Sequence, residues 1–455
     1  MHHAGVVSRS SRAITGAVLV ALATVTPHAH ASPAEVFGLG SRQAAQAGAG
    51  VASVDDMAAP LVNPAGLARS RGKRLTLGAQ GAYSNLHIND RRTPLTDPAG
   101  GLFGLTAPAP LGGVLTDRIH VGLGMYVLPG TIARIVARFP DEPFYPYYQG
   151  RTERLVIVPG IGVRVARRLE VGLAANVMAG LGGSLQASEG ATRELEARVD
   201  EKVPGVARII AGAAWQPIDA LRLGLVFRQR FEVPFATRAE IEVAGEPIDL
   251  DLRAAGQFSP TQLAAGVAWL TDAATVSFDL TYARWSAYPG PFVEVKSELP
   301  LVGPLAAELP LVPWQDTIGA RLGAEAPLGD AMVLRGGYGF ETSAVPAEQP
   351  GVTNLLDGPH HTIGAGLGLA WSRGKGKKVR VDLHVQAQLV QGRTLHKTVL
   401  APGQDADGFD GLRDEVTDDA NDPATQGAQI SNPGYPSIDS GGQVFAGGLT
   451  MEVEL

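Results

Sequence analysis

Apolar and polar residues alternate along several stretches of the chain. In residues 380–389 every second residue is apolar, and the polar residues between them share the opposite face of an extended strand. These polar residues are Arg380, Asp382, His384, Gln386 and Gln388. The same period of two occurs at 118–125, 221–227 and 275–282. Each stretch therefore predicts a strand with one apolar and one polar face.

Extended to the whole chain, the pattern predicts about 14 strands. They lie near 73–86, 101–111, 118–128, 153–166, 169–182, 206–216, 220–236, 258–270, 274–287, 314–326, 330–341, 360–372, 378–391 and 442–455. The connections alternate between short and long. The short turns are 166–168, 216–219, 271–273, 327–329 and 372–376, and the longer loops are rich in proline or charge.

This sorting of connections distinguishes two kinds of all-β protein. A soluble sandwich shows the same alternation but has no reason to sort its loops, whereas an outer-membrane barrel has tight turns at one end and long loops at the other. An even number of strands closes such a barrel and leaves both chain ends on the side of the short turns. No apolar run of roughly 18 residues follows residue 31, so helical membrane spans are not expected. We therefore predict an all-β transmembrane antiparallel barrel.

Residues 35–68 do not fit the strand pattern. They are rich in glycine, alanine and other small residues and contain the turn Asn63-Pro64-Ala65-Gly66. This segment is too apolar for a solvated tail and too broken by glycine and proline for a long helix or strand. We expect it to be packed inside the barrel.

The first residues have the features of an export signal. Arg9 and Arg12 precede an apolar run from about Ala13 to Val25, and small residues around Ala31 suit cleavage by a signal peptidase. Residues 1–31 are predicted to be a signal peptide, with a short buried helix as the alternative.

Composition removes several classes of protein. The 455 residues include no cysteine and carry a net charge of -7, which indicates neither a disulfide scaffold nor a basic nucleic-acid binder. The sequence contains no HExxH, GxSxG or phosphate-loop motif, and adjacent strand residues such as His360 and His361 face opposite sides. We therefore expect no enzyme activity, no cofactor, no metal site and no nucleic-acid partner.

Several motifs resemble the FadL/TodX family of outer-membrane transporters for long-chain fatty acids and other hydrophobic compounds. The motifs occur in order along nearly the whole chain. They are the segment ending in Asn63-Pro64-Ala65-Gly66, the Trp285-Ser286 pair, the block from Trp314 through Arg321, the Leu334-Arg335-Gly-Gly-Tyr338 stretch, Ser343-Ala-Val-Pro346 and Leu356-Asp357. Three positions depart from the family pattern. Gly358-Pro359-His360-His361 follows Leu356-Asp357, where the family usually places an arginine, and Ser343-Ala-Val-Pro346 replaces a Ser-Pro-Val-Pro sequence. The chain also ends at Leu455 rather than at an aromatic residue.

The resemblance implies a signal peptide at 1–31, an N-terminal hatch at 32–70 that plugs the lumen, and a barrel at 71–455 in the outer membrane of a Gram-negative bacterium. It implies passive transport by capture at outer loops, binding inside the barrel, hatch movement and lateral release. The implied partners are a long-chain fatty acid or another hydrophobic ligand, outer-membrane lipids and lipopolysaccharide, and the implied state is a monomer. A general porin or structural barrel and, less favoured, an outer-membrane lipid hydrolase remain alternatives.

Three groups of residues are candidates for these steps. The hatch candidates are Phe37, Asn63, Pro64, Ala65 and Gly66, where an Asn-Pro turn can hold backbone groups inside the plug or can simply lead into the first strand. The ligand candidates lie in or beside the loop 129–150, which combines apolar, aromatic and basic residues. They are Arg134, Ile135, Arg138, Phe139, Phe144, Tyr145, Tyr148 and Arg151, and their alternative role is rim and loop packing. The candidates for a strand kink that opens the wall are Pro108, Gly122 and Gly124.

An acidic loop lies before the last strand. Eight carboxylates fall within residues 405–422, but their spacing does not complete a calcium-binding loop, because Phe409 stands at an oxygen-ligand position. A solvated loop is the favoured interpretation, and divalent ions that bridge it to lipopolysaccharide are the alternative.

Overall fold

The computed structural model describes fifteen stretches of the chain. They are residues 33–89, 91–93, 97–128, 143–149, 155–178, 181–187, 197–203, 205–243, 246–292, 294–299, 303–306, 311–349, 353–373, 377–396 and 437–455. The predicted signal peptide, the acidic loop 405–422 and five of the ligand candidates lie outside these residues. The five candidates are Arg134, Ile135, Arg138, Phe139 and Arg151.

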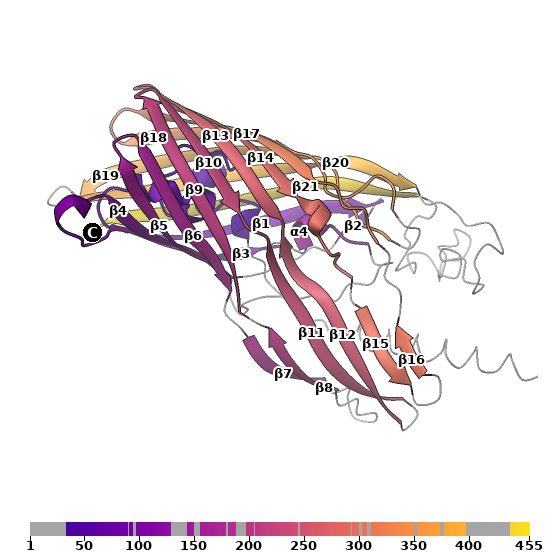
Figure 1. Ribbon diagram of the computed structural model, residues 1–455. Helices are drawn as coiled ribbons and strands as arrows, with labels where there is room; N and C mark the ends of the chain where they lie inside the picture. The colour runs from indigo at the N-terminus through magenta and orange to yellow at the C-terminus, as the bar shows by residue number, and fades with distance from the viewer. Residues whose placement is uncertain are drawn as a thin grey trace, which may run out of the picture.

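Antiparallel strands form a closed barrel (Figure 1). The main sheet has 15 strands, one of which, β2 (Arg91–Arg92), is an appendage of β1, and the pairing of β1 with β3 closes the other 14 into a ring. The strands of the ring are β1 (Arg74–Ile88), β3 (Ala99–Pro108), β4 (Ile119–Val127), β5 (Val156–Ala166), β6 (Leu169–Met178), β9 (Val206–Ile218), β10 (Leu221–Arg228), β13 (Thr261–Leu270), β14 (Thr275–Arg284), β17 (Thr317–Leu328), β18 (Met332–Glu341), β19 (His360–Arg373), β20 (Lys377–His396) and β21 (Ser437–Glu454). The predicted fold class and strand number are confirmed.

The connections sort to the two ends of the barrel as predicted. Short turns join β5 to β6, β9 to β10, β13 to β14, β17 to β18 and β19 to β20. We call this the short-turn end, and β1 begins and β21 ends there. The opposite, long-loop end carries α4 (Pro146–Gln149), η4 (Trp285–Ala287), and the hairpin of β7 (Leu181–Ala187) with β8 (Ala197–Val203). The short connection between β3 and β4 contains η3 (Gly113–Leu115).

Two predicted strands are wrong in their extent. The predicted strand 220–236 is divided between β10 and β11 (Phe231–Val243), and the predicted strand 258–270 between β12 (Glu246–Ser259) and β13. β11 and β12 form a second sheet with β15 (Glu294–Leu299) and β16 (Gly303–Ala306), which projects beyond the barrel (Figure 1). Alternation continues across the division, and it carries no information about which sheet a strand joins.

The barrel is apolar outside and polar inside. Along β20, Asp382 and Gln388 are each 2% exposed, whereas the intervening Leu383 is 44% exposed. Large apolar side chains are likewise exposed on the other strands, for example Leu280 at 48%. A water-soluble protein has the reverse distribution, so this surface is suited to a lipid surround. Within the part of the chain that the structure describes, no helix is long and apolar enough to cross a membrane.

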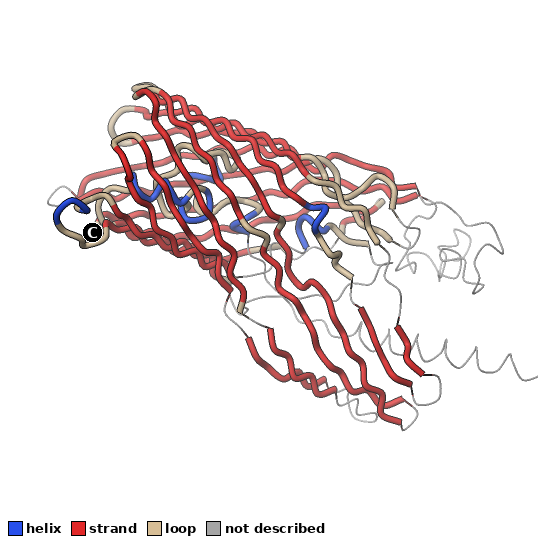
Figure 2. The backbone as a smooth tube through the Cα atoms, viewed as in Figure 1, coloured by secondary structure: helices blue, strands red, loops and turns tan. Residues whose placement is uncertain are grey.

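The N-terminal residues Pro33–Ser70, here called the inner segment, lie in the lumen (Figure 2). The segment contains η1 (Pro33–Glu35), α2 (Ser41–Ala45), α3 (Ala59–Val62) and η2 (Pro64–Arg69). η2 contacts β5, β6 and β9, while α2 contacts β18, β19, β20 and β21. Since these strands belong to different parts of a closed ring, a segment that touches both sets occupies its interior.

Glycines in the wall make room for the inner segment. A Cβ atom at Gly172 of β6 would lie 2.2 Å from the carbonyl carbon of Pro64, and one at Gly337 of β18 would lie 2.2 Å from that of Gln46. Both neighbours are backbone atoms, which cannot rotate away. The abundance of glycine in the strands therefore has a packing reason here.

Candidate functional site

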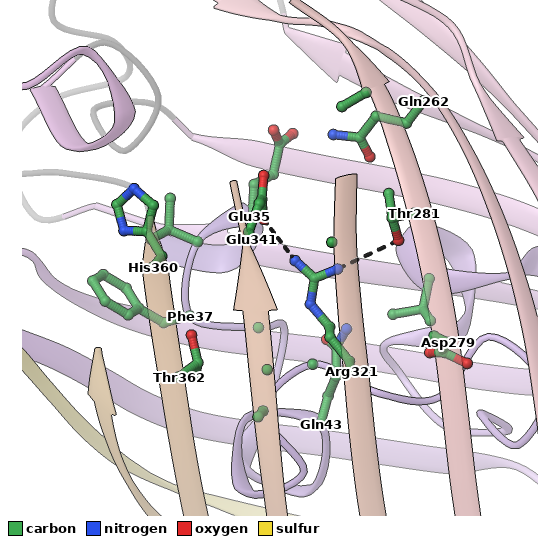
Figure 3. A pocket seen from close by; sticks show the side chains of 18 of the residues that line it. Glu35, Phe37, Gln43, Gln262, Asp279, Thr281, Arg321, Glu341, His360 and Thr362 are labelled. Atoms are coloured by element: carbon green, nitrogen blue, oxygen red, sulfur yellow. Dashed lines mark hydrogen bonds and ion pairs between the residues drawn. The ribbon is translucent and has the colours of Figure 1, made fainter. Parts of the chain in front are cut away.

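A cavity of about 110 Å³ lies between the inner segment and the barrel wall (Figure 3). We call it the chamber. The inner segment supplies Glu35, Val36, Phe37 and Val51 to its lining, and the wall supplies mostly polar and charged residues. The polar wall residues are Arg208, Arg228, Gln262, Asp279, Thr281, Thr317, Arg321, Glu341, His360, Thr362 and Gln386.

Two wall arginines in the chamber have different partners. Arg321 of β17 donates to Glu341 Oε2 at 2.9 Å and to Thr281 Oγ1 at 3.3 Å (Figure 3). Arg228 of β10 instead donates to the backbone carbonyls of Leu61 at 3.0 Å and Val62 at 2.6 Å. These carbonyls belong to the end of α3, where backbone acceptors are left over. Arg228 also donates to Gln262 Oε1 at 3.3 Å, and among the described residues it forms no ion pair with a carboxylate.

A buried set of donors holds Glu35 at the edge of the chamber. Glu35 Oε1 accepts hydrogen bonds from Arg208 at 2.8 Å and Asn176 at 2.9 Å, and Oε2 accepts one from Ser259 Oγ at 2.7 Å. The three donor residues are at most 1% exposed, and the Glu35 side chain is 6% exposed. Asn176, Arg208 and Ser259 lie near the strand ends that face the long loops.

Aromatic residues of the loop 143–149 close the chamber on the long-loop side. The Tyr147 ring stacks on His360 with centroids 4.0 Å apart. The Tyr148 hydroxyl donates to Gln388 Oε1 at 3.0 Å and lies 3.3 Å from His360 Nδ1. Burial raises the pKa of Tyr148 well above its ordinary value, so the phenol remains a neutral donor. We call the loop 143–149 the cap. Gln388 in turn donates to the Val36 carbonyl at 2.9 Å, which connects the cap to the inner segment.

Two apolar clusters surround the cap. Tyr145 and Tyr148 pack with Phe37 of the inner segment in one cluster. Phe144 packs with Trp285 and Trp314 in the other. The Tyr145 hydroxyl accepts a hydrogen bond from the Gly441 amide at 2.8 Å and donates to the His87 carbonyl at 2.6 Å. The cap is thereby tied to the rim of the barrel.

The structure separates the three described ligand candidates from the chamber. Phe144, Tyr145 and Tyr148 are buried in the cap clusters and do not line the chamber, whereas their neighbour Tyr147 does. Sequence reasoning missed the wall residues Arg208, Arg228 and Arg321. The alternation of β17 does place Arg321 on the lumen face. Alternation alone does not show at which height in the barrel a residue lies, so it could not assign Arg321 to the chamber.

The hatch candidates are buried in the lumen. Asn63 Nδ2 donates to the carbonyls of Val51 at 2.7 Å and Ala213 at 3.2 Å, and its Oδ1 accepts from the Ala65 amide at 3.2 Å. Pro64, Ala65 and Gly66 form the first half of η2 and are buried. Phe37 is 2% exposed and borders the chamber. The Asn63 amide thus joins two parts of the inner segment to strand β9.

Ion pairs fix the inner segment at the short-turn end. Arg42 of α2 donates to both carboxylate oxygens of Glu325 at 2.9 Å and pairs with Asp55 at 2.5 Å. Glu325 also pairs with Arg335, which pairs with Asp382 at 2.7 Å. Bidentate arginine contacts of this kind fix orientation as well as charge.

The Arg42–Asp55 pair remains ionised at neutral pH. Burial acts to raise the pKa of Asp55, but the charge of Arg42 outweighs it and holds this pKa well below its ordinary value of 3.8. A carboxyl with a depressed folded-state pKa stabilises the fold fully above its ordinary pKa, and this contribution is lost only as the pH falls toward the depressed value. Mild acidification therefore leaves this anchor in place.

The predicted kink at Pro108, Gly122 and Gly124 is wrong. β3 and β4 are paired continuously from Gly101–Val127 to Pro108–His120, so the wall has no gap there. The glycines serve packing instead, because a Cβ at Gly122 would lie 2.4 Å from Leu67 Cδ2 and one at Gly124 would lie 2.6 Å from the Met57 carbonyl oxygen. The β5–β6 ladder is less regular, passing from Ile157–Val177 to Gly160–Ala174 across Pro159, which has no N–H to donate.

Reactive groups are few and do not form a catalytic or metal site among the described residues. These residues contain no group of three or more potential metal ligands of the His, Cys, Asp or Glu type. Ser343 Oγ donates to Asp357 Oδ2 at 2.7 Å, and His360 Nε2 lies 2.8 Å from Asp357 Oδ1. Because the carboxylate lies between the hydroxyl and the imidazole, His360 cannot act as the base for Ser343 as in a hydrolase triad.

The architecture has counterparts among solved structures. The chain is similar to a Pseudomonas aeruginosa FadL homologue with a TM-score of 0.59 and 12% identity, over 94% of this chain and 99% of the other. It is similar to the CymD monoaromatic hydrocarbon channel (TM-score 0.56, 15% identity, 92% and 98% covered) and to the Pseudomonas putida toluene transporter TodX (0.55, 14%, 92% and 99%). No protein-family model matches the chain, and no curated protein matches it. At these identities the likeness shows a shared fold, and it confirms the resemblance to FadL/TodX proteins at that level.

Proposed function

We propose that the chain is an outer-membrane channel for the passive uptake of hydrophobic molecules, above all long-chain fatty acids. The observation that carries this proposal is a charged chamber beneath an apolar cap, inside a barrel whose outer face is apolar. An amphiphile with an apolar chain and one anionic group matches both environments. The solved structures with this fold include a FadL homologue and channels for toluene and monoaromatic hydrocarbons, which agrees with the class of solute.

The filled lumen favours this function over that of a general porin. A porin conducts through an open aqueous lumen, whereas here the inner segment crosses the lumen and Arg42 ties it to Glu325 of the wall. The inner segment is therefore the hatch of the proposed channel. With the short-turn end occupied, release sideways through the wall is the route that we propose for the ligand.

The projecting sheet provides a surface for first capture. Its register pairs the apolar residues Ile241 with Ile248 and Ala239 with Leu250, and at the same alternate spacing it pairs Leu252 with Val295 of β15. The charged pair Asp251–Lys296 falls on the other face. A hydrophobic solute gains free energy when it transfers from water to such an apolar face.

The charges of the chamber favour a fatty acid over a neutral hydrocarbon. Arg228 and Arg321 present guanidinium groups there, and a neutral aromatic ligand would cover them without replacing the hydration that they lose. A carboxylate can instead accept charge-assisted hydrogen bonds from them.

Uptake and conductance together test the proposal. In bacteria that lack their own outer-membrane fatty acid channel, expression of the full chain is expected to restore uptake of radiolabelled oleate. The purified chain in a planar bilayer is expected to show low ion conductance, and a variant lacking residues 33–70 is expected to conduct ions. High conductance of the full chain, unchanged by that deletion, would indicate a porin, and oleate uptake equal to that of cells without the protein would contradict the transport function.

A further inference from the structure

Glu35 occupies a ready-made carboxylate site. Arg208, Asn176 and Ser259 present one guanidinium, one amide and one hydroxyl donor to the two carboxylate oxygens of Glu35, over distances of 2.7–2.9 Å. The three donors come from three strands of the wall and its extension, β6, β9 and β12, whereas Glu35 comes from η1, at the start of the described chain. The donors thus belong to the wall and its extension, and the carboxylate is carried by a short element of the inner segment.

We propose that Glu35 is an internal mimic of the ligand, and that the carboxylate of an incoming fatty acid displaces it from the Arg208–Asn176–Ser259 site. This inference rests on the proposed function and specifies how the ligand is recognised and how it releases the hatch. The ligand class is a monocarboxylate with a long apolar chain. No covalent step is involved, because one carboxylate replaces another.

The position of the site supports displacement rather than a purely structural anchor. Glu35 and Arg208 both line the chamber, so a ligand bound there lies beside them. Asn176 and Arg208 lie near the long-loop ends of β6 and β9, the side from which a solute from outside arrives. The Arg42 anchor, in contrast, does not line the chamber and pairs with the wall at the short-turn end.

The electrostatics make the exchange selective. Arg208 is 1% exposed, and a buried guanidinium is strongly destabilised when its carboxylate partner leaves without replacement. A neutral hydrocarbon or alcohol offers no replacement, so Glu35 stays in place. A ligand carboxylate restores both the charge and the hydrogen bonds, which allows Glu35 to leave at little net cost. Recognition of the anion is thereby coupled to release of η1.

Release of Glu35 would reach the cap through its neighbours in the chain. The Val36 carbonyl accepts from Gln388, which also accepts from the Tyr148 hydroxyl. Phe37 packs in the same cluster as Tyr145 and Tyr148. A shift of residues 35–37 therefore removes contacts that hold the cap closed.

Ligand binding by the full chain in lipid nanodiscs tests the inference. Oleate and oleyl alcohol have the same apolar chain, but only oleate carries a carboxylate. Glu35→Gln keeps the shape of the side chain and removes its charge, so the affinity for oleate is expected to rise by about tenfold or more, while that for oleyl alcohol stays unchanged; tenfold corresponds to about 1.4 kcal/mol. Glu170→Gln is the control, because it removes a carboxylate that pairs with an arginine of the inner segment, Arg69, without altering the chamber or the Arg208 site. It is expected to leave the oleate affinity within about twofold of the wild type, because substitutions at distant sites act nearly independently.

Hydrogen–deuterium exchange provides a second readout. Oleate is expected to accelerate exchange of the amides of residues 34–37 in the wild type, oleyl alcohol is expected to leave it unchanged, and Glu35→Gln is expected to exchange rapidly without ligand. Arg208→Gln is expected to remove the preference for oleate over oleyl alcohol.

Two results would overturn the inference in distinguishable ways. Equal gains for both ligands in Glu35→Gln, or no gain for either, would show that Glu35 does not compete with a carboxylate, while the transport function stands. A wild-type chain that binds neither oleate nor oleyl alcohol would contradict both the inference and the proposed function.

Discussion

Gly172 shows how one absent side chain positions the inner segment. Replacement by alanine would put a Cβ atom 2.2 Å from the carbonyl carbon and 2.4 Å from the amide nitrogen of the Pro64–Ala65 peptide. Overpacking of this kind costs about 1–3 kcal/mol. We expect Gly172→Ala to lower the midpoint of urea unfolding, measured by the loss of the compact electrophoretic form, and to accelerate exchange of the amides around Ala65.

Gly336→Ala is the matched control for this substitution. It also lies in a barrel strand, but the nearest atom to its added Cβ is the Gly364 carbonyl oxygen at 3.9 Å, an ordinary contact. The control is expected to unfold at the wild-type midpoint. Equal shifts in the two variants would mean that strand glycine itself, rather than the approach of Pro64, sets the stability.

At the scale of single residues, the sequence contained part of the site. The alternation in 380–389 identified Gln386 and Gln388 as sharing a polar face, and both are buried in the lumen, where they bond to carbonyls of the inner segment. The pairing of Glu35 with Arg208 joins residues that are 173 positions apart. No local pattern brings such residues together, because their contact depends on where the inner segment meets the wall.

The strands differ in how far their position could be predicted from the sequence. The 14 barrel strands were identifiable because each alternates and is bounded by turn residues. The division of 220–236 into β10 and β11 was not, because Phe231 and Val233 continue the alternation past the end of β10. Likewise Gly122 and Gly124 suggested flexibility of β4, whereas they accommodate Leu67 and Met57.

The β11–β12 hairpin permits a test at this scale. From Ala236–Arg253 to its tip, β11 pairs only with β12, and β12 pairs with β15 rather than with a barrel strand. Removal of residues 238–251, with Thr237 and Leu252 joined by an Asn-Gly turn, should therefore leave the barrel able to fold. We expect the variant to keep the wild-type resistance to unfolding, but to show a severalfold higher KM for oleate uptake because the apolar capture face is shortened.

A second variant separates capture from a general effect of loop shortening. Deletion of residues 182–202 from the β7–β8 hairpin, which is a separate two-stranded sheet, shortens another outer loop by a larger number of residues. Its effect on KM is expected to be smaller. If the barrel unfolds when the β11–β12 tip is removed, the projecting sheet supports the fold and is not an independent capture surface.

Across the barrel, polar side chains are buried in the lumen and apolar side chains are exposed outside. This distribution defines which face of each strand points toward the lumen. Outward alternation predicted the lipid face of the last strand, where Phe445 and Leu449 are each 46% exposed. The course of the inner segment through the lumen followed from composition only in outline. Its course depends on which wall glycines lie against the backbone of the inner segment. A sequence pattern does not show this three-dimensional fit.

The five tryptophans divide between the two environments of the barrel, and this division makes the membrane position measurable. Trp215, Trp269 and Trp371 are each 50–52% exposed and lie within three residues of strand ends at the short-turn end, whereas Trp285 and Trp314 are buried in the apolar cluster beside the cap. Tryptophan prefers the interface between lipid headgroups and acyl chains. In vesicles with brominated lipids we expect strong quenching of tryptophan fluorescence, greater with bromine near the headgroup than near the acyl-chain end. The Trp285→Phe, Trp314→Phe double variant should retain this quenching. A triple variant with Trp215→Phe, Trp269→Phe and Trp371→Phe should lose most of it. Quenching that persists in the triple variant would place the cluster beside the cap, rather than the apolar outer face, in contact with lipid.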